Sequence, residues 1–72
     1  MKLLFQNSYG EERVISEPKT EEEAYKDIVK FCDEHNYKMP YCRTWKVDNR
    51  KHYDCGSWSE FFILVFEEEG GN

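Results

Sequence analysis

The sequence of 72 residues lacks a long apolar run, and this absence bounds its cellular location. The longest run, Phe61 to Phe66, is far shorter than the ~20 residues that a membrane-spanning helix needs. Met1 to Asn7 holds only a short apolar stretch, which is too brief for the apolar region of a signal peptide. We therefore expect a cytoplasmic protein that makes no membrane contact.

Cysteine is scarce and glycine is scattered, which argues against two further classes of protein. Three cysteines fit a secreted disulfide framework poorly, because their number is odd. In a reducing compartment such thiols persist as packing groups, catalytic groups or metal ligands. The four glycines form no phosphate-binding loop, and no other catalytic constellation stands out. We expect a protein that acts by binding and is not an enzyme.

Charge is plentiful but unevenly distributed along the chain. The net charge of −5 disfavours a conventional phosphate-binding role. Residues 11–34 hold nine acids, whereas residues 38–51 hold five bases against one acid, Asp48. This segregation predicts an acidic face and a basic hairpin, although ordinary solvated surface is the simpler interpretation of any single cluster.

The first half of the chain predicts two strands and a helix. Residues 2–6 form a short apolar strand, and residues 12–16 return as its hairpin partner, ended by Pro18. The helix begins at Thr20, which caps free amides while Glu23 reaches back in a capping box. Apolar residues at helical spacing define a core-facing stripe, and the helix ends near residues 35–36.

The second half predicts three further strands. Residues 41–47 and 50–55 form a hairpin around a turn at Asp48 and Asn49, which both tolerate positive φ. Residues 60–66 are apolar on both faces, which places this strand centrally under the helix. The alternative for that run is a helix capped by Ser57. The predicted fold is an α+β domain of ββαβββ order over residues 1–66, with an acidic, glycine-containing tail at 67–72.

The cysteines and one histidine predict a metal site. Cys32 and His35 are three residues apart at the helix end, so both side chains point to one side. Counting outward from the hairpin turn places Cys42 opposite Cys55, on the same face of the strands. Together they would form a Cys₃His set that stabilises the sheet and helix through a structural zinc ion. His52 falls on the other hairpin face beside Trp45, and a one-residue register change would substitute it for His35.

Two other interpretations of the cysteines remain open, namely reduced packing groups in the core and a Cys42–Cys55 disulfide. Zinc has an energetic argument in its favour. A core of this size supplies roughly 3–5 kcal/mol, whereas zinc binding to small finger domains is worth ~10–16 kcal/mol. Four protein ligands leave no open coordination position, so such a metal would be structural.

Two kinds of binding partner are compatible with these features. Basic and aromatic residues interleave on the hairpin, as in proteins that bind single-stranded nucleic acid. Alternatively, an acidic face can occupy a basic groove of a partner protein and exclude its natural ligand. The residues that we expect to contact a partner are Glu23, Asp27 and Glu34 on the helix, and Arg43 and Arg50 at the hairpin tip.

Two segments, residues 4–10 (LFQNSYG) and 56–62 (GSWSEFF), resemble those of short proteins encoded by phages and prophages of Gram-positive bacteria. Within that group, the size, acidity and apparent metal site are similar to those of type II-A anti-CRISPR proteins. Members of that group share no fold, so no functional residue carries over. The resemblance implies a Cas9 inhibitor that acts in the bacterial host cytoplasm. It would interfere with guide or target loading, since Cas9 holds nucleic acid in a positively charged channel.

Overall fold

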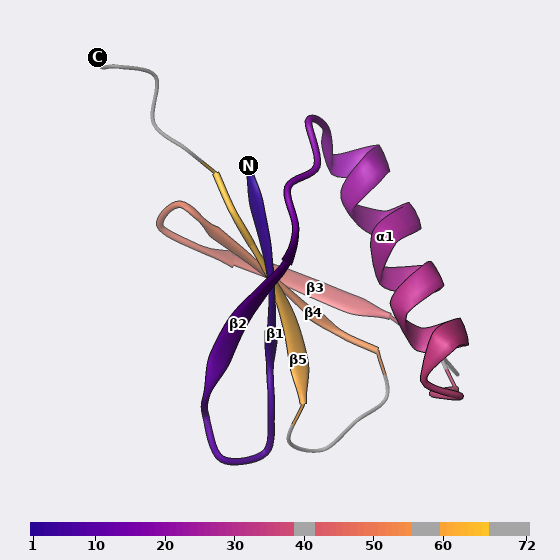
Figure 1. The fold of residues 1–72 in the computed structure, drawn as a ribbon. Helices are drawn as coiled ribbons and strands as arrows, with labels where there is room; N and C mark the ends of the chain where they lie inside the picture. The colour runs from indigo at the N-terminus through magenta and orange to yellow at the C-terminus, as the bar shows by residue number, and fades with distance from the viewer. Residues whose placement is uncertain (39–41, 56–59, 67–72) are drawn as a thin grey trace.

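The computed structural model describes residues 1–38, 42–55 and 60–66. Within these ranges the elements follow in the order β1 (Lys2–Gln6), β2 (Glu12–Ser16), α1 (Glu21–Glu34), β3 (Arg43–Val47), β4 (Arg50–Asp54) and β5 (Phe61–Val65). The strands form one twisted sheet of order β2-β1-β5-β4-β3, with every neighbouring pair antiparallel (Figure 1). The predicted ββαβββ fold is therefore confirmed.

The last strand occupies the centre of the sheet, as its composition predicts. β5 pairs with β1 on one side and with β4 on the other, so it joins the two hairpins. Phe62 and Leu64 are buried beneath the helix, while Ile63 is buried on the opposite face. The alternative of a helix over this segment is wrong, because a strand between two neighbours satisfies its backbone and buries both of its faces.

Helix α1 begins and ends with the signals present in its sequence. The Thr20 hydroxyl accepts a hydrogen bond from the Glu23 amide at 3.1 Å, and the Glu23 carboxylate accepts one from the Lys19 amide at 3.0 Å. Asn36 closes the helix with φ of 58°, and the Tyr37 amide donates to the Cys32 carbonyl at 2.8 Å. This is a Schellman closure with asparagine in the left-handed position.

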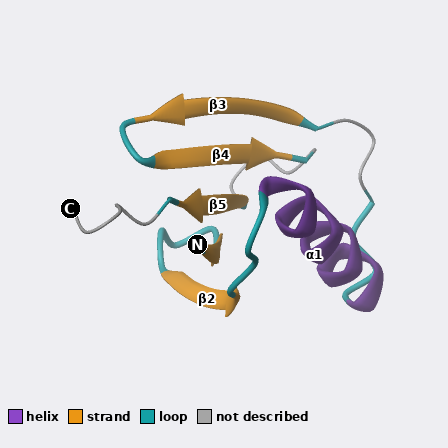
Figure 2. Ribbon diagram, turned by 90° about the horizontal axis from the view of Figure 1, so that it is seen from above, coloured by secondary structure: helices purple, strands orange, loops and turns teal. Residues whose placement is uncertain are grey.

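The core lies between α1 and one face of the sheet. Ile28 is fully buried at its centre, together with Leu3 from β1 and Leu64 from β5. Helix residues Ala24, Phe31 and Cys32 complete the helical side of the core. Figure 2 shows α1 on one side of the sheet, and none of the described elements covers the other side.

Some predictions fall outside the described residues. These are the acidic tail at 67–72, the turn at residues 56 and 57, and residue 41 of the first hairpin strand. Within the described part of the chain, no helix has the length and apolar character needed to cross a membrane.

Candidate functional site

Two of the predicted metal ligands meet at the open end of the β3–β4 hairpin. The pairs Val47–Arg50 and Trp45–His52 confirm the predicted register, and only Asp48 of the turn has a positive φ, 55°. The Sγ atoms of Cys42 and Cys55 lie 3.1 Å apart, just beyond the last strand pair. The hairpin therefore brings these two thiols into contact, as counting from its turn predicts.

The third cysteine approaches from the last turn of α1. Cys32 is buried, and burial raises the pKa of its thiol, with a smaller contribution from the neighbouring Cys42. Burial also raises the pKa of Cys55, helped by its hydrogen bond with Cys42 and by the charges of Cys42 and Cys32. All three thiols are free. Cys32 and Cys55 belong to one buried core against which Cys42 packs, and we call these three cysteines the thiol cluster.

The predicted fourth ligand, His35, has partners of its own. Its Nδ1 atom lies 2.9 Å from the Phe31 carbonyl oxygen, and its ring stacks on that of Phe31 at 4.1 Å. Among the described residues, no three or more His, Cys, Asp or Glu side chains are arranged as ligands of one ion. His52 stacks on Trp45 at 5.3 Å, on the opposite face of the hairpin, as predicted. The Cys₃His site stays a prediction.

We expect reduced, metal-free protein to lose stability at alkaline pH. The unfolded chain ionises Cys32 and Cys55 near their ordinary pKa of about 8.5, whereas burial keeps both thiols protonated in the fold. Their contribution to stability is complete below the unfolded pKa and is lost as pH rises toward the folded pKa. The free energy of unfolding should fall from about pH 8.5 to pH 10, as checked by urea denaturation across this range.

A variant with both Cys32→Ala and Cys55→Ala substitutions is the control for this pH dependence. Its urea midpoint should be nearly constant up to about pH 10, above which ionisation of Tyr53 adds its own effect, because burial raises that pKa too. An equal fall in the double variant would show that the thiols do not cause it.

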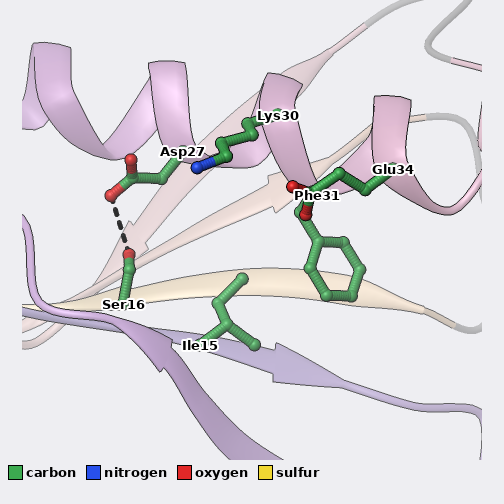
Figure 3. A pocket seen from close by; sticks show the side chains of 6 residues that line it. All are labelled: Ile15, Ser16, Asp27, Lys30, Phe31 and Glu34. Carbon is green, nitrogen blue, oxygen red and sulfur yellow. Dashed lines mark hydrogen bonds between the residues drawn. The ribbon is translucent and has the colours of Figure 1, made fainter.

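The predicted acidic contacts lie on the flank of α1 beside β2. Asp27 is half-buried and accepts a hydrogen bond from the Ser16 hydroxyl at 2.8 Å (Figure 3). Asp27 and Glu34 also border a small pocket of about 150 Å³, whose other lining residues are Ile15, Ser16, Lys30 and Phe31. Glu23 is exposed, but its carboxylate is engaged in capping the helix. Glu34 is thus the acid of the three with the most accessible position beside this pocket.

The two predicted arginine contacts do not share the hairpin tip, which corrects that expectation. Arg50 lies next to the turn and pairs with Glu12 at 3.2 Å, whereas Arg43 lies at the far end and pairs with Asp54 at 2.9 Å. Arg50 is paired with Val47, which lies four residues along β3 from Arg43. Four residues of a strand span about 13 Å, so the two arginines lie at opposite ends of the hairpin. Both arginines are also partly neutralised by these carboxylates.

Sequence reasoning missed two features of the hairpin. Lys51 pairs with Glu21 at the start of α1 at 3.0 Å, and this hydrogen bond raises the pKa of Lys51 and lowers that of Glu21. The second feature is the exposed apolar pair Trp45 and Val47 on β3. Its signal in the sequence was the alternation of these two residues with polar neighbours. It places both apolar side chains on the sheet face that α1 does not cover, where they are exposed.

Comparisons with known proteins add no relatives: no family model, no curated protein and no solved structure matches this chain.

Proposed function

We propose that this chain is a protein-binding inhibitor that uses the flank of α1 beside β2 to occupy a basic groove on its partner. The observation that carries this proposal is the acidic border of the pocket, formed by Asp27 and Glu34 over an apolar floor of Ile15 and Phe31. An apolar floor with acids at its rim suits the long, cationic side chains that line nucleic-acid grooves.

The distribution of charge over the molecule supports an acidic binding surface. Residues 21–34 of the helix carry six acids against two lysines, and three of the acids lie in its first turn. The hairpin bases Arg50 and Lys51 pair with Glu12 and Glu21, so neither lies at the pocket, where Lys30 is the base among the described lining residues beside Asp27 and Glu34. A surface of one sign accelerates association with a partner of the other sign.

The resemblance to type II-A anti-CRISPR proteins favours Cas9 as the partner. Its channel for guide RNA and target DNA is positively charged, so an acidic ligand seated there would block nucleic-acid loading. Another host protein with a basic groove is the alternative partner, and in that case the chain would act as an adaptor or inhibitor of that factor.

The contact test is charge reversal at Glu34. Glu34→Lys should weaken binding to a type II-A Cas9 by about tenfold or more, because an attractive contact becomes repulsive. The measurements are the dissociation constant and the inhibition of DNA cleavage, at matched salt concentration. The melting temperature should be nearly unchanged, since Glu34 is exposed and its substitution leaves the core intact.

Asp33→Lys is the matched control for this test. Asp33 is the exposed neighbour of Glu34, and the same charge change there points about 100° away around the helix. It should weaken binding by less than about threefold, through long-range charge alone. Equal effects of the two variants would place the contact elsewhere, and undiminished inhibition by Glu34→Lys would exclude this flank.

Binding of single-stranded nucleic acid is the second candidate function, favoured by the exposed ring of Trp45 stacked on His52. The pairing of Arg43 and Arg50 with carboxylates weakens this candidate, because it removes charge that phosphates would need. Affinity for oligodeoxythymidine that decreases steeply with salt would support it over protein binding.

The proposal includes a structural zinc ion held by the thiol cluster and His35. Cys32, Cys42 and Cys55 would supply three thiolate ligands, and the hairpin already brings Cys42 and Cys55 to 3.1 Å from each other. The hydrogen bond from His35 Nδ1 to the Phe31 carbonyl leaves Nε2 for the metal, an arrangement common among metal-bound histidines. The donor types therefore fit zinc, which would supply stability and no chemistry.

A further inference from the structure

We propose that the free edge of β3 binds an extended segment of a partner protein as a sixth strand, and that this segment alternates acidic and apolar residues. This surface is separate from the acidic flank of α1, so the inference does not depend on the function proposed above.

No element in the described part of the chain covers the edge of β3. β3 is the last strand of the sheet, and all five of its residues are exposed. Figure 2 shows β3 at the outside of the sheet with β4 as its one neighbour among the described elements. An exposed edge strand without proline is a template for pairing with another chain.

The hydrogen-bond pattern identifies which backbone groups point outward. The Phe66 amide donates to the Asn49 carbonyl at 2.8 Å, so odd-numbered residues at this end of the hairpin direct their backbone groups toward β5. The even-numbered residues of β4 therefore bond to their partners Arg43, Trp45 and Val47 on β3. By alternation, Thr44 and Lys46 direct their N–H and C=O groups away from the sheet.

The opposite edge of the sheet is less suited to this role. The β1–β2 pairing contains a register shift between Leu3 and Leu4, which increases the local twist. β2 is also followed closely by Pro18, and its last residues are half-buried. Irregularities of this kind protect an edge from further pairing, whereas β3 pairs with β4 in unbroken register.

The side chains of β3 specify what an incoming strand should carry. Trp45 and Val47 are 43% and 51% exposed on the uncovered face, so residues beside them should be apolar. Lys46 projects to the helix side, where its Nζ lies 4.7 Å from the centre of the Phe66 ring. Residues beside Lys46 should be acidic. Successive residues of a strand point to opposite faces, so the two requirements alternate along the partner.

Charge complementarity favours such a partner over a second copy of this chain. Three of the four hairpin bases, Arg43, Arg50 and Lys51, pair with carboxylates, so Lys46 supplies the positive charge that the β3 edge offers to an incoming strand. Pairing of β3 with β3 of a second copy would place the Lys46 ammonium groups of both copies on the same face of the joined sheet, which is unfavourable. An acidic strand meets the same edge with opposite charge.

The test uses a blocked seven-residue peptide of alternating glutamate and valine, with a lysine-and-valine peptide as its matched control. Amide shifts in NMR spectra of ¹⁵N-labelled protein should move at Thr44 and Lys46 with the acidic peptide, and the β2 edge should not respond. Lys46→Pro removes an outward N–H and should weaken binding by about tenfold or more, whereas Lys46→Ala keeps this N–H and should weaken it less.

A charge-swap variant keeps the test decisive if the proline variant does not fold. Lys46→Glu retains the backbone donor and should reverse the preference, so that the lysine peptide binds better than the glutamate peptide. Equal binding of both peptides to the unmodified protein would overturn the proposal. Analytical ultracentrifugation provides a second outcome that would overturn it. If the unmodified protein is a dimer and both Lys46→Glu and Lys46→Pro are monomers, a second copy of the chain occupies this edge.

Discussion

Replacing Ile28 with alanine should remove most of the stability of this protein. Ile28 is fully buried at the centre of the core, between α1 and strands β1 and β5. Truncating a buried isoleucine to alanine costs about 2–5 kcal/mol, and a domain of this size has roughly 3–5 kcal/mol in total. The variant should therefore show a strongly reduced urea midpoint, or no cooperative transition by circular dichroism.

Val29→Ala is the matched control on the same helix. Val29 is 41% exposed, so its truncation leaves no cavity and should change the free energy of unfolding by less than about 1 kcal/mol. A small effect of Ile28→Ala would mean that another source of stability dominates. A metal ion bound to the thiol cluster would be such a source of stability, and removal of zinc tests it.

Zinc removal should have the largest effect of any single perturbation, if the thiol cluster holds the ion. We expect purified protein to contain stoichiometric zinc, and a chelator to lower its melting temperature by tens of degrees or abolish folding. The physical reason is that metal binding to small zinc domains is worth ~10–16 kcal/mol, which exceeds the contribution of the core. Elemental analysis measures the zinc content, and thermal unfolding with and without chelator measures the change in melting temperature.

The two histidines provide an internal control for this prediction. His35→Ala should weaken zinc binding, while His52→Ala should not, because His52 lies on the opposite hairpin face against Trp45. Protein that contains no metal and melts identically with chelator would refute the site. The three sulfurs would then be reduced packing groups, consistent with the contact of Cys42 with Cys55 and with the burial of Cys32 and Cys55.

Local signals in the sequence were sufficient for the elements and for most of their boundaries. The cap at Thr20 and the closing residue Asn36 predicted the helix because capping is decided within a few residues. The doubly apolar run at residues 60–66 predicted a central strand, since a strand with a neighbour on each side buries more of both its faces than an edge strand does. The contact between Cys42 and Cys55 followed from the hairpin turn alone, because a two-residue turn sets the register.

The surface contacts were not predictable in the same way. Arg50 and Glu12 are 38 residues apart in the chain, and they meet because β1 and β5 place the two hairpins in one sheet. Lys51 and Glu21 meet for a similar reason, across the packing of α1 on the sheet. Long side chains make such pairs only after the backbone is placed, and periodicity carries no information about them.

The sequence by itself determined the strands, the helix, the hairpin register and the core-facing stripe of the helix up to Cys32, although His35, expected in the same stripe, is exposed. Each of these depends on hydrophobic periodicity and turn chemistry, which act over short stretches of chain. Only the tertiary structure decided that the acidic residues flank a pocket beside β2, that the arginines are paired with carboxylates, and that β3 is a free edge. Those features depend on the order of the strands and on how the helix packs on the sheet. Both are determined by burial of the shared core, to which segments far apart in the sequence contribute.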